Sequence, residues 1–85
     1  MPYISQENRK ALKNLTDEIE KTKISSPGDL NYLITMLCKK YFLQEKESYT
    51  THNSIVGVLE SSKLEWYRKR TSRYEDKKIS ENGDV

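Results

Sequence analysis

Apolar residues recur at helical spacing in three stretches of the chain. In the first, Leu12, Leu15 and Ile19 lie three and four residues apart, and Ser5 stands where an N-cap would. This pattern predicts a helix over about 5–23. The second stretch has the widest apolar face, which predicts the central helix of the core over 27–43; its members are Leu30, Leu33, Ile34, Leu37, Cys38, Tyr41 and Phe42.

The start of the second helix has the clearest local signals. Ser26 is expected to be its N-cap, Pro27 fits the first helical position, and Asp29 stands where a capping-box acid would. A third helix is predicted over 51–70, with Thr50 or Thr51 as its N-cap.

Gly57 lies inside the third predicted helix, where glycine destabilises the helix by about 1 kcal/mol relative to alanine. We interpret this glycine as a point where another helix approaches closely, with approach of a ligand as the alternative. Beyond Thr71 the apolar pattern fails. Ser72 could cap a short final turn over 72–79, and a disordered tail is the alternative.

These elements predict an all-α fold, a single small three-helix domain over 1–85 with a short C-terminal helical turn or tail. Hydrophobic residues make up 34% of the chain and charged residues 33%. Because such a composition gives a thin core for this length, we expect a helical homo-oligomer that buries more surface. A marginal monomer with frayed ends is the alternative.

The net charge, the cysteine content and the lengths of the apolar runs limit the classes of binding partner that we expect. The net charge of +2 is too small to indicate a nucleic-acid binder, although residues 63–78 carry a local basic excess. The one cysteine, Cys38, excludes a disulfide within the chain and is expected in the core. No apolar run has the length of a membrane span and no signal peptide is visible, so we expect a cytoplasmic protein with no membrane partner.

Catalytic motifs are missing from the sequence. The single histidine, His52, cannot form a histidine metal cluster alone, and the three glycines are scattered rather than gathered in a phosphate-binding loop. We therefore expect no enzymatic activity, no metal site and no cofactor.

Three groups of residues are candidates for binding. Asn31 and Tyr32 lie off the apolar stripe in the first turn of the second helix, and His52 and Asn53 lie at the start of the third, where a helix N-terminus attracts anions. The third group combines cations that suit phosphates with tyrosines that stack on bases and with polar residues that suit ribose hydroxyls. It consists of Tyr67, Arg68, Tyr74, Lys77, Lys78, Asn82 and Asp84. For each group, an ordinary solvated surface is the alternative.

Four segments of the chain form recognisable motifs: residues 27–32 (PGDLNY), 57–60 (GVLE), 65–68 (EWYR) and YEDxKxxxNGDV over 74–85. In these motifs, which span nearly the whole chain, it resembles a family of short uncharacterised proteins from phages, prophages and other microbial genomes. The chain departs from the family pattern at Arg73, where proline is expected, and at Lys69, where arginine is expected. Arg70 and Arg73 are therefore weaker candidates than Arg68 or Tyr74.

By analogy with compact phage proteins of the Sequestin-like type, the resemblance implies a function without turnover. The protein would sequester an anionic signalling nucleotide, a cyclic nucleotide or an ADP-ribose derivative, at a subunit interface in the host cytoplasm, and so counter bacterial immune signalling. The alternative hypothesis is a helical interaction or regulatory module that binds a host or phage protein. In that case residues 74–85 would act as a structural latch.

Overall fold

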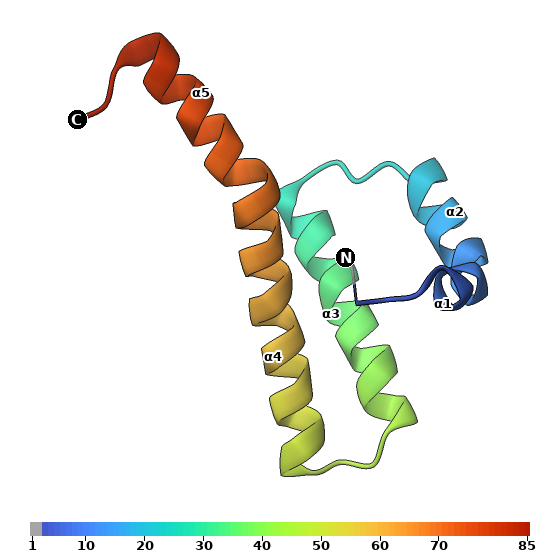
Figure 1. The fold of residues 1–85 in the computed structure, drawn as a ribbon. Helices are drawn as coiled ribbons and strands as arrows, with labels where there is room; N and C mark the ends of the chain where they lie inside the picture. The colour runs from blue at the N-terminus through green and yellow to red at the C-terminus, as the bar shows by residue number, and fades with distance from the viewer. Residues whose placement is uncertain (1–2) are drawn as a thin grey trace. The chain divides into compact units, whose positions relative to one another are not determined.

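A computed structural model describes residues 3–85 (Figure 1), and over this range every regular element is helical. The all-α prediction is therefore confirmed. The chain divides into two units, one ending at Lys40 and one beginning at Tyr41. Each unit is described by itself.

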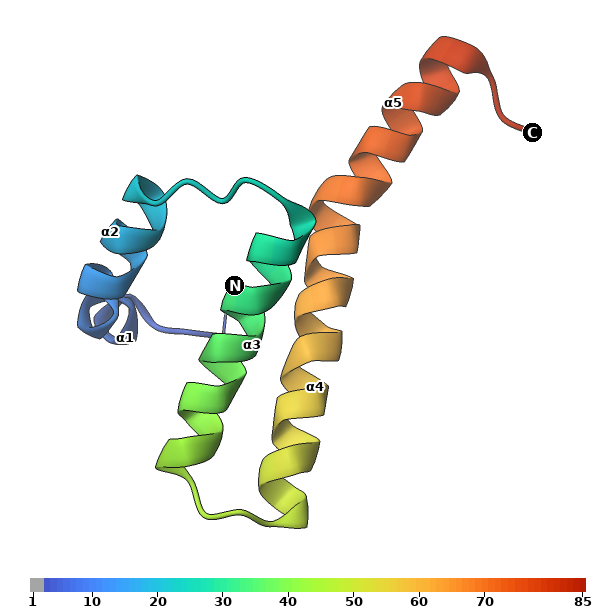
Figure 2. The same ribbon diagram turned by 180° about the vertical axis from the view of Figure 1, so that it is seen from behind.

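The first unit begins with two short helices, α1 (Gln6–Ala11) and α2 (Lys13–Lys21). Ser5 caps α1 as predicted, because its Oγ accepts a hydrogen bond from the Asn8 N–H at 3.1 Å. The predicted single helix over 5–23 is instead interrupted at Leu12, whose φ of −102° and ψ of 3° leave the helical region. The Leu12 N–H reaches back three residues to the Arg9 carbonyl, and the chain turns sharply there in both views (Figures 1 and 2).

The next helix, α3 (Pro27–Gln44), begins where the sequence predicts. The Asp29 N–H donates to the Ser26 Oγ at 3.1 Å, so Ser26 is the N-cap. Asp29 Oδ2 in turn accepts a hydrogen bond from the Ser25 N–H at 3.0 Å. This is a capping-box arrangement displaced by one residue, which ties the approaching chain to the first turn of the helix.

The second unit contains one long helical run made of α4 (Tyr49–Trp66), a π-helical turn (Tyr67–Thr71) and α5 (Ser72–Asn82). Helical dihedrals persist through both junctions, so the break predicted between residues 70 and 72 does not occur, and Ser72 is not a cap. The last helical residue is Asn82, three residues past the predicted end at 79, and Gly83, with a φ of 83°, follows it as the C-cap.

The N-cap of α4 is Ser48 rather than Thr50 or Thr51. The Ser48 Oγ accepts a hydrogen bond from the Thr51 N–H at 3.1 Å. Thr51 instead donates its hydroxyl to the Lys46 carbonyl at 2.7 Å and is the one buried residue among those described. The Thr51 side chain therefore holds the loop that precedes α4 against the first turn of that helix.

The predicted core is not formed within the described chain. None of the apolar side chains in residues 3–85 is buried, and Cys38 is half-buried. The close approach expected at Gly57 is also missing, because a Cβ at that position would meet no atom within 4 Å. The apolar face of α3 was correctly located in sequence, but it borders an open groove instead of a closed interior.

Candidate functional site

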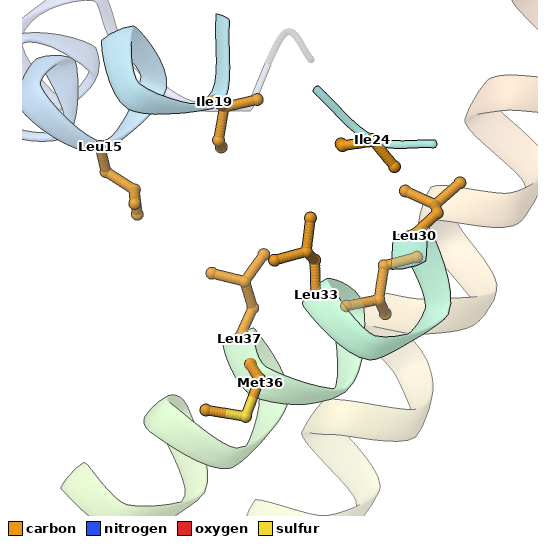
Figure 3. Close-up of a pocket in the computed structure, with 8 residues that line it drawn as sticks. Leu15, Ile19, Ile24, Leu30, Leu33, Met36 and Leu37 are labelled. Atoms are coloured by element: carbon orange, nitrogen blue, oxygen red, sulfur yellow. The ribbon is translucent and has the colours of Figure 1, made fainter. Parts of the chain in front are cut away.

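An apolar groove lies between α2 and α3, wholly within the first unit, and has a volume of about 260 Å³. We call it the α2–α3 groove. Figure 3 shows side chains from the two helices pointing toward one another across it. The groove is lined by Leu15, Ile19, Ile24, Leu30, Leu33, Ile34, Met36 and Leu37.

The spacing of the lining residues explains how the sequence builds this groove. Leu15 and Ile19 are one helical turn apart on α2, while the α3 residues follow one another at three and four residues. The helix α2 ends at Thr22, whose backbone is extended, with φ −90° and ψ 129°; its N–H and its hydroxyl both donate to the Glu18 carbonyl, at 3.0 and 2.6 Å. Ile24 in the following connection then closes one end.

The chemistry of the groove is uniform. Seven of its side chains are hydrocarbon, and the eighth, Met36, carries a thioether. Each keeps between 37% and 50% of its surface exposed, with Leu33 the least exposed and Leu37 the most. The groove therefore suits apolar side chains rather than a phosphate or a sugar.

A second set of contacts lies at the start of α4. His52 Nε2 is 3.1 Å from Glu47 Oε2, and the imidazole ring lies against Phe42 with ring centroids 5.2 Å apart. These contacts link the end of α3 to the beginning of α4. His52 thus contacts residues on both sides of this loop and stays exposed, as does Asn53 beside it.

A third feature is a stripe of alternating aromatic and cationic side chains on the long helical run, formed by Trp66, Arg70, Tyr74 and Lys78. The Arg70 guanidinium lies 5.7 Å from the centroid of the Trp66 ring, and the Lys78 ammonium lies 5.5 Å from that of Tyr74. Trp66 is 63% exposed and Tyr74 60% exposed. We call this the aromatic–cation stripe.

The π-helical turn keeps the stripe on one face of the helix. In a regular α-helix each step of four residues drifts by about 40°, so three steps would separate Trp66 from Lys78 by about 120°. In the π turn the Ser72 N–H reaches the Tyr67 carbonyl five residues earlier, which widens the turn by one residue. The extra residue rotates α5 back, so that Tyr74 and Lys78 follow Trp66 and Arg70.

A hydrogen bond across the π turn gives independent evidence of this rotation. The Tyr67 hydroxyl lies 3.1 Å from both carboxylate oxygens of Glu75, eight residues later. The two positions would diverge by about 80° in a regular α-helix. The hydrogen bond from its hydroxyl to the Glu75 carboxylate raises the pKa of Tyr67 above 10.0, with a smaller contribution from the charge of Glu75.

Cations at the beginning of the π turn also have partners. Glu65 lies 2.8 Å from Lys69 and 3.5 Å from Arg68. The hydrogen bond from Lys69 is the main reason why the pKa of Glu65 lies below 4.5; desolvation opposes it. Arg68, a predicted phosphate ligand, therefore contacts a carboxylate of its own helix.

The structure brings together only part of the predicted binding set. Asn31 and Tyr32 belong to the first unit, whereas His52 and Tyr67 share one helical run and lie about 22 Å apart along its axis at 1.5 Å per residue. The other predicted residues lie on the π turn, on α5 or just beyond it; these are Arg68, Tyr74, Lys77, Lys78, Asn82 and Asp84. Among them, only Tyr74 and Lys78 belong to the stripe.

Sequence reasoning missed Trp66 and Arg70 as members of a surface shared with Tyr74 and Lys78. The four residues are spaced four apart in sequence, which could have indicated a shared surface. That spacing places them on one face only if the helix continues past residue 70. Most of the groove residues were identified from their apolar spacing, as core, but Met36 was not.

The described residues contain neither a cluster of metal ligands nor a membrane-spanning helix. No cluster of His, Cys, Asp and Glu side chains within residues 3–85 could hold a metal ion. Of the helices described, none combines the length and apolar character needed to span a bilayer.

The chain belongs to the family of the domain of unknown function DUF6899, whose model matches residues 1–85. No curated protein and no solved structure matches it. Since the family description names no activity, the function must be argued from the groove and the stripe.

Proposed function

We propose that this member of the DUF6899 family is a non-enzymatic helical interaction module that binds another polypeptide through its α2–α3 groove. The observation that carries the proposal is the groove itself, in which eight neighbouring apolar side chains stay 37–50% exposed. Contiguous apolar surface of this kind is characteristic of interaction sites, because covering it contributes about 25 cal/mol per Å².

The shape and chemistry of the groove define what fits it. Two helices with apolar residues facing one another accept the apolar face of a third helix, which would present residues at spacings of three and four. With only hydrocarbon and thioether groups lining it, the groove offers no hydrogen-bonding partner to a polar ligand. A buried polar group there would remain unsatisfied at a cost of about 1–3 kcal/mol.

Site-specific photo-crosslinking in cells that make the protein tests this function. A photoreactive amino acid in place of Met36 is expected to give a covalent adduct with a polypeptide. The matched control carries the same group in place of Tyr49, which is 83% exposed and lies in the second unit. Absence of any polypeptide adduct at position 36, or equal adducts at both positions, would contradict the proposal.

The aromatic–cation stripe favours a second candidate function, the binding of an anionic nucleotide without turnover. Arg70 and Lys78 would neutralise phosphates, while Trp66 and Tyr74 would stack on bases. The support is their exposure and their alternation along one helix face. A single convex face covers only one side of a small ligand, so this function needs a second surface, such as that of another copy.

Quenching of Trp66 fluorescence and thermal-shift measurements with cyclic nucleotides and ADP-ribose derivatives test the second candidate. Binding is expected to weaken in Arg70→Ala and Lys78→Ala. It is expected to persist in Lys63→Ala, because Lys63 lies off the stripe. The control is matched, since Lys63 pairs with Glu60 at 3.0 Å as Lys78 does with Glu81 at 3.1 Å. If no nucleotide of either class stabilises the protein or quenches Trp66, the stripe is not a nucleotide site.

A further inference from the structure

We propose that the occupant of the α2–α3 groove is the same groove of a second copy, related by a two-fold axis. Two copies would then join α2 and α3 of each chain into a four-helix arrangement with the lining residues inside. This inference rests on the proposed function, since it requires the groove to be covered by polypeptide, and it specifies which polypeptide does so.

The size of the surface supports a dimer. Eight large apolar side chains line the groove, each 37–50% exposed, and a second copy would cover them together; a standard interface buries about 800 Å² per partner. A second groove offers an equal apolar area, as a symmetric contact requires.

The charge distribution also permits the groove to face itself. Its lining carries no charge, so two copies of it do not repel one another. On α2 the nearby charges pair locally, Lys13 with Asp17 at 2.8 Å and Lys21 with Glu18 at 4.0 Å. A charged groove would require a partner of opposite sign, whereas a neutral apolar one is complementary to itself.

The exposure of the chain's other apolar residues strengthens the case. No apolar side chain in residues 3–85 is buried, so the groove cannot be regarded as an accessory to a finished core. Interfaces between identical subunits are more apolar than those of transient complexes, as this surface is. Side chains spaced three and four residues apart form ridges on a helix, and such ridges interdigitate with those of a second helix when the two pack together.

Sedimentation and light scattering on matched variants test the inference. The wild type is expected at twice the chain mass of 10.0 kDa, and Leu37→Asp at the single chain mass. The control is Leu64→Asp, the same change at a similarly exposed leucine in the second unit, which should remain dimeric; Leu37 is 50% and Leu64 57% exposed. A wild type that stays monomeric throughout the micromolar range overturns the inference, as does a dimer that survives Leu37→Asp.

The Met36 photo-crosslink separates failure of this inference from failure of the proposed function, and needs no destabilising change. In purified protein an adduct at twice the chain mass supports the dimer, even if Leu37→Asp does not fold. A monomeric wild type whose Met36 adduct in cells contains another protein overturns the dimer and leaves the interaction module standing. No polypeptide adduct in either setting overturns both.

Discussion

At the scale of single residues, Tyr67 reports the geometry of the π turn. Because the Tyr67 hydroxyl donates a hydrogen bond to the Glu75 carboxylate, the pKa of Tyr67 is raised above the ordinary value for a tyrosine. Its pKa is raised on folding, so the contact stabilises the fold fully below about pH 10 and is lost as the pH rises through the raised value. Ultraviolet absorbance of the phenolate measures this.

The matched variants for this titration are Tyr67→Phe and Tyr49→Phe. The first is expected to remove the last tyrosine to titrate, while the second, at an 83% exposed position far from Glu75 in sequence, should leave that late titration in place. A late-titrating tyrosine that persists in Tyr67→Phe would show that the Glu75 contact does not exist in solution.

Gly57 gives a second prediction at this scale. It lies inside α4, and a Cβ there meets no atom within 4 Å. Gly57→Ala is therefore expected to stabilise the protein by about 0.5–1 kcal/mol through helix propensity, measured by urea unfolding. Gly83→Ala should instead destabilise it, because φ at Gly83 is 83°. If Gly57→Ala lowers the stability, another chain packs closely against this position.

Helix caps show how far single residues were predictable from sequence. Ser5 and Ser26 were found because each is the hydroxyl residue placed just before a helical pattern. At the third start, Ser48, Thr50 and Thr51 are all competent caps within four residues. The choice depends on which backbone is extended, and only Ser48, with φ −163° and ψ 166°, is in that region.

At the scale of elements, the two departures from prediction have different causes. The interruption at Leu12 has no glycine or proline to signal it, so the uninterrupted apolar spacing predicted one helix where there are two. The long helical run was divided because a constant period of 3.6 residues scatters the apolar positions beyond Arg70. The π turn changes that period locally, and no pattern that assumes a fixed one can detect the continuation.

Shortening the π turn tests its role. Deleting Arg68, whose side chain is 73% exposed, is expected to restore a regular α-helix and rotate α5 by about 100° relative to α4. Helicity by circular dichroism should be retained, while Tyr67 loses its Glu75 partner and the pKa of Tyr67 falls. Arg68→Ala removes the same side chain at unchanged length and should keep the late titration. A deletion variant that also keeps it would show that the π turn does not set the alignment.

At the scale of the whole molecule, periodicity and composition predicted different properties. The all-α class followed from the spacing of apolar residues, and the thin core followed from their low proportion. Periodicity identified Leu30, Leu33 and Leu37 as one face of α3, but a face has the same sequence signature whether its own chain or another covers it. Whether these residues lie inside is therefore not encoded in their spacing.

This ambiguity leads to a prediction about stability. If another copy covers the groove, folding and association are linked, and the thermal midpoint must rise with protein concentration. Each tenfold increase adds about 1.4 kcal/mol per dimer, which corresponds to a shift of several degrees for a domain of this size. Calorimetry should find this dependence in the wild type and in Leu64→Asp, but not in Leu37→Asp. A wild-type midpoint that is independent of concentration would contradict the dimer, because a chain that folds without association gains nothing from neighbouring copies.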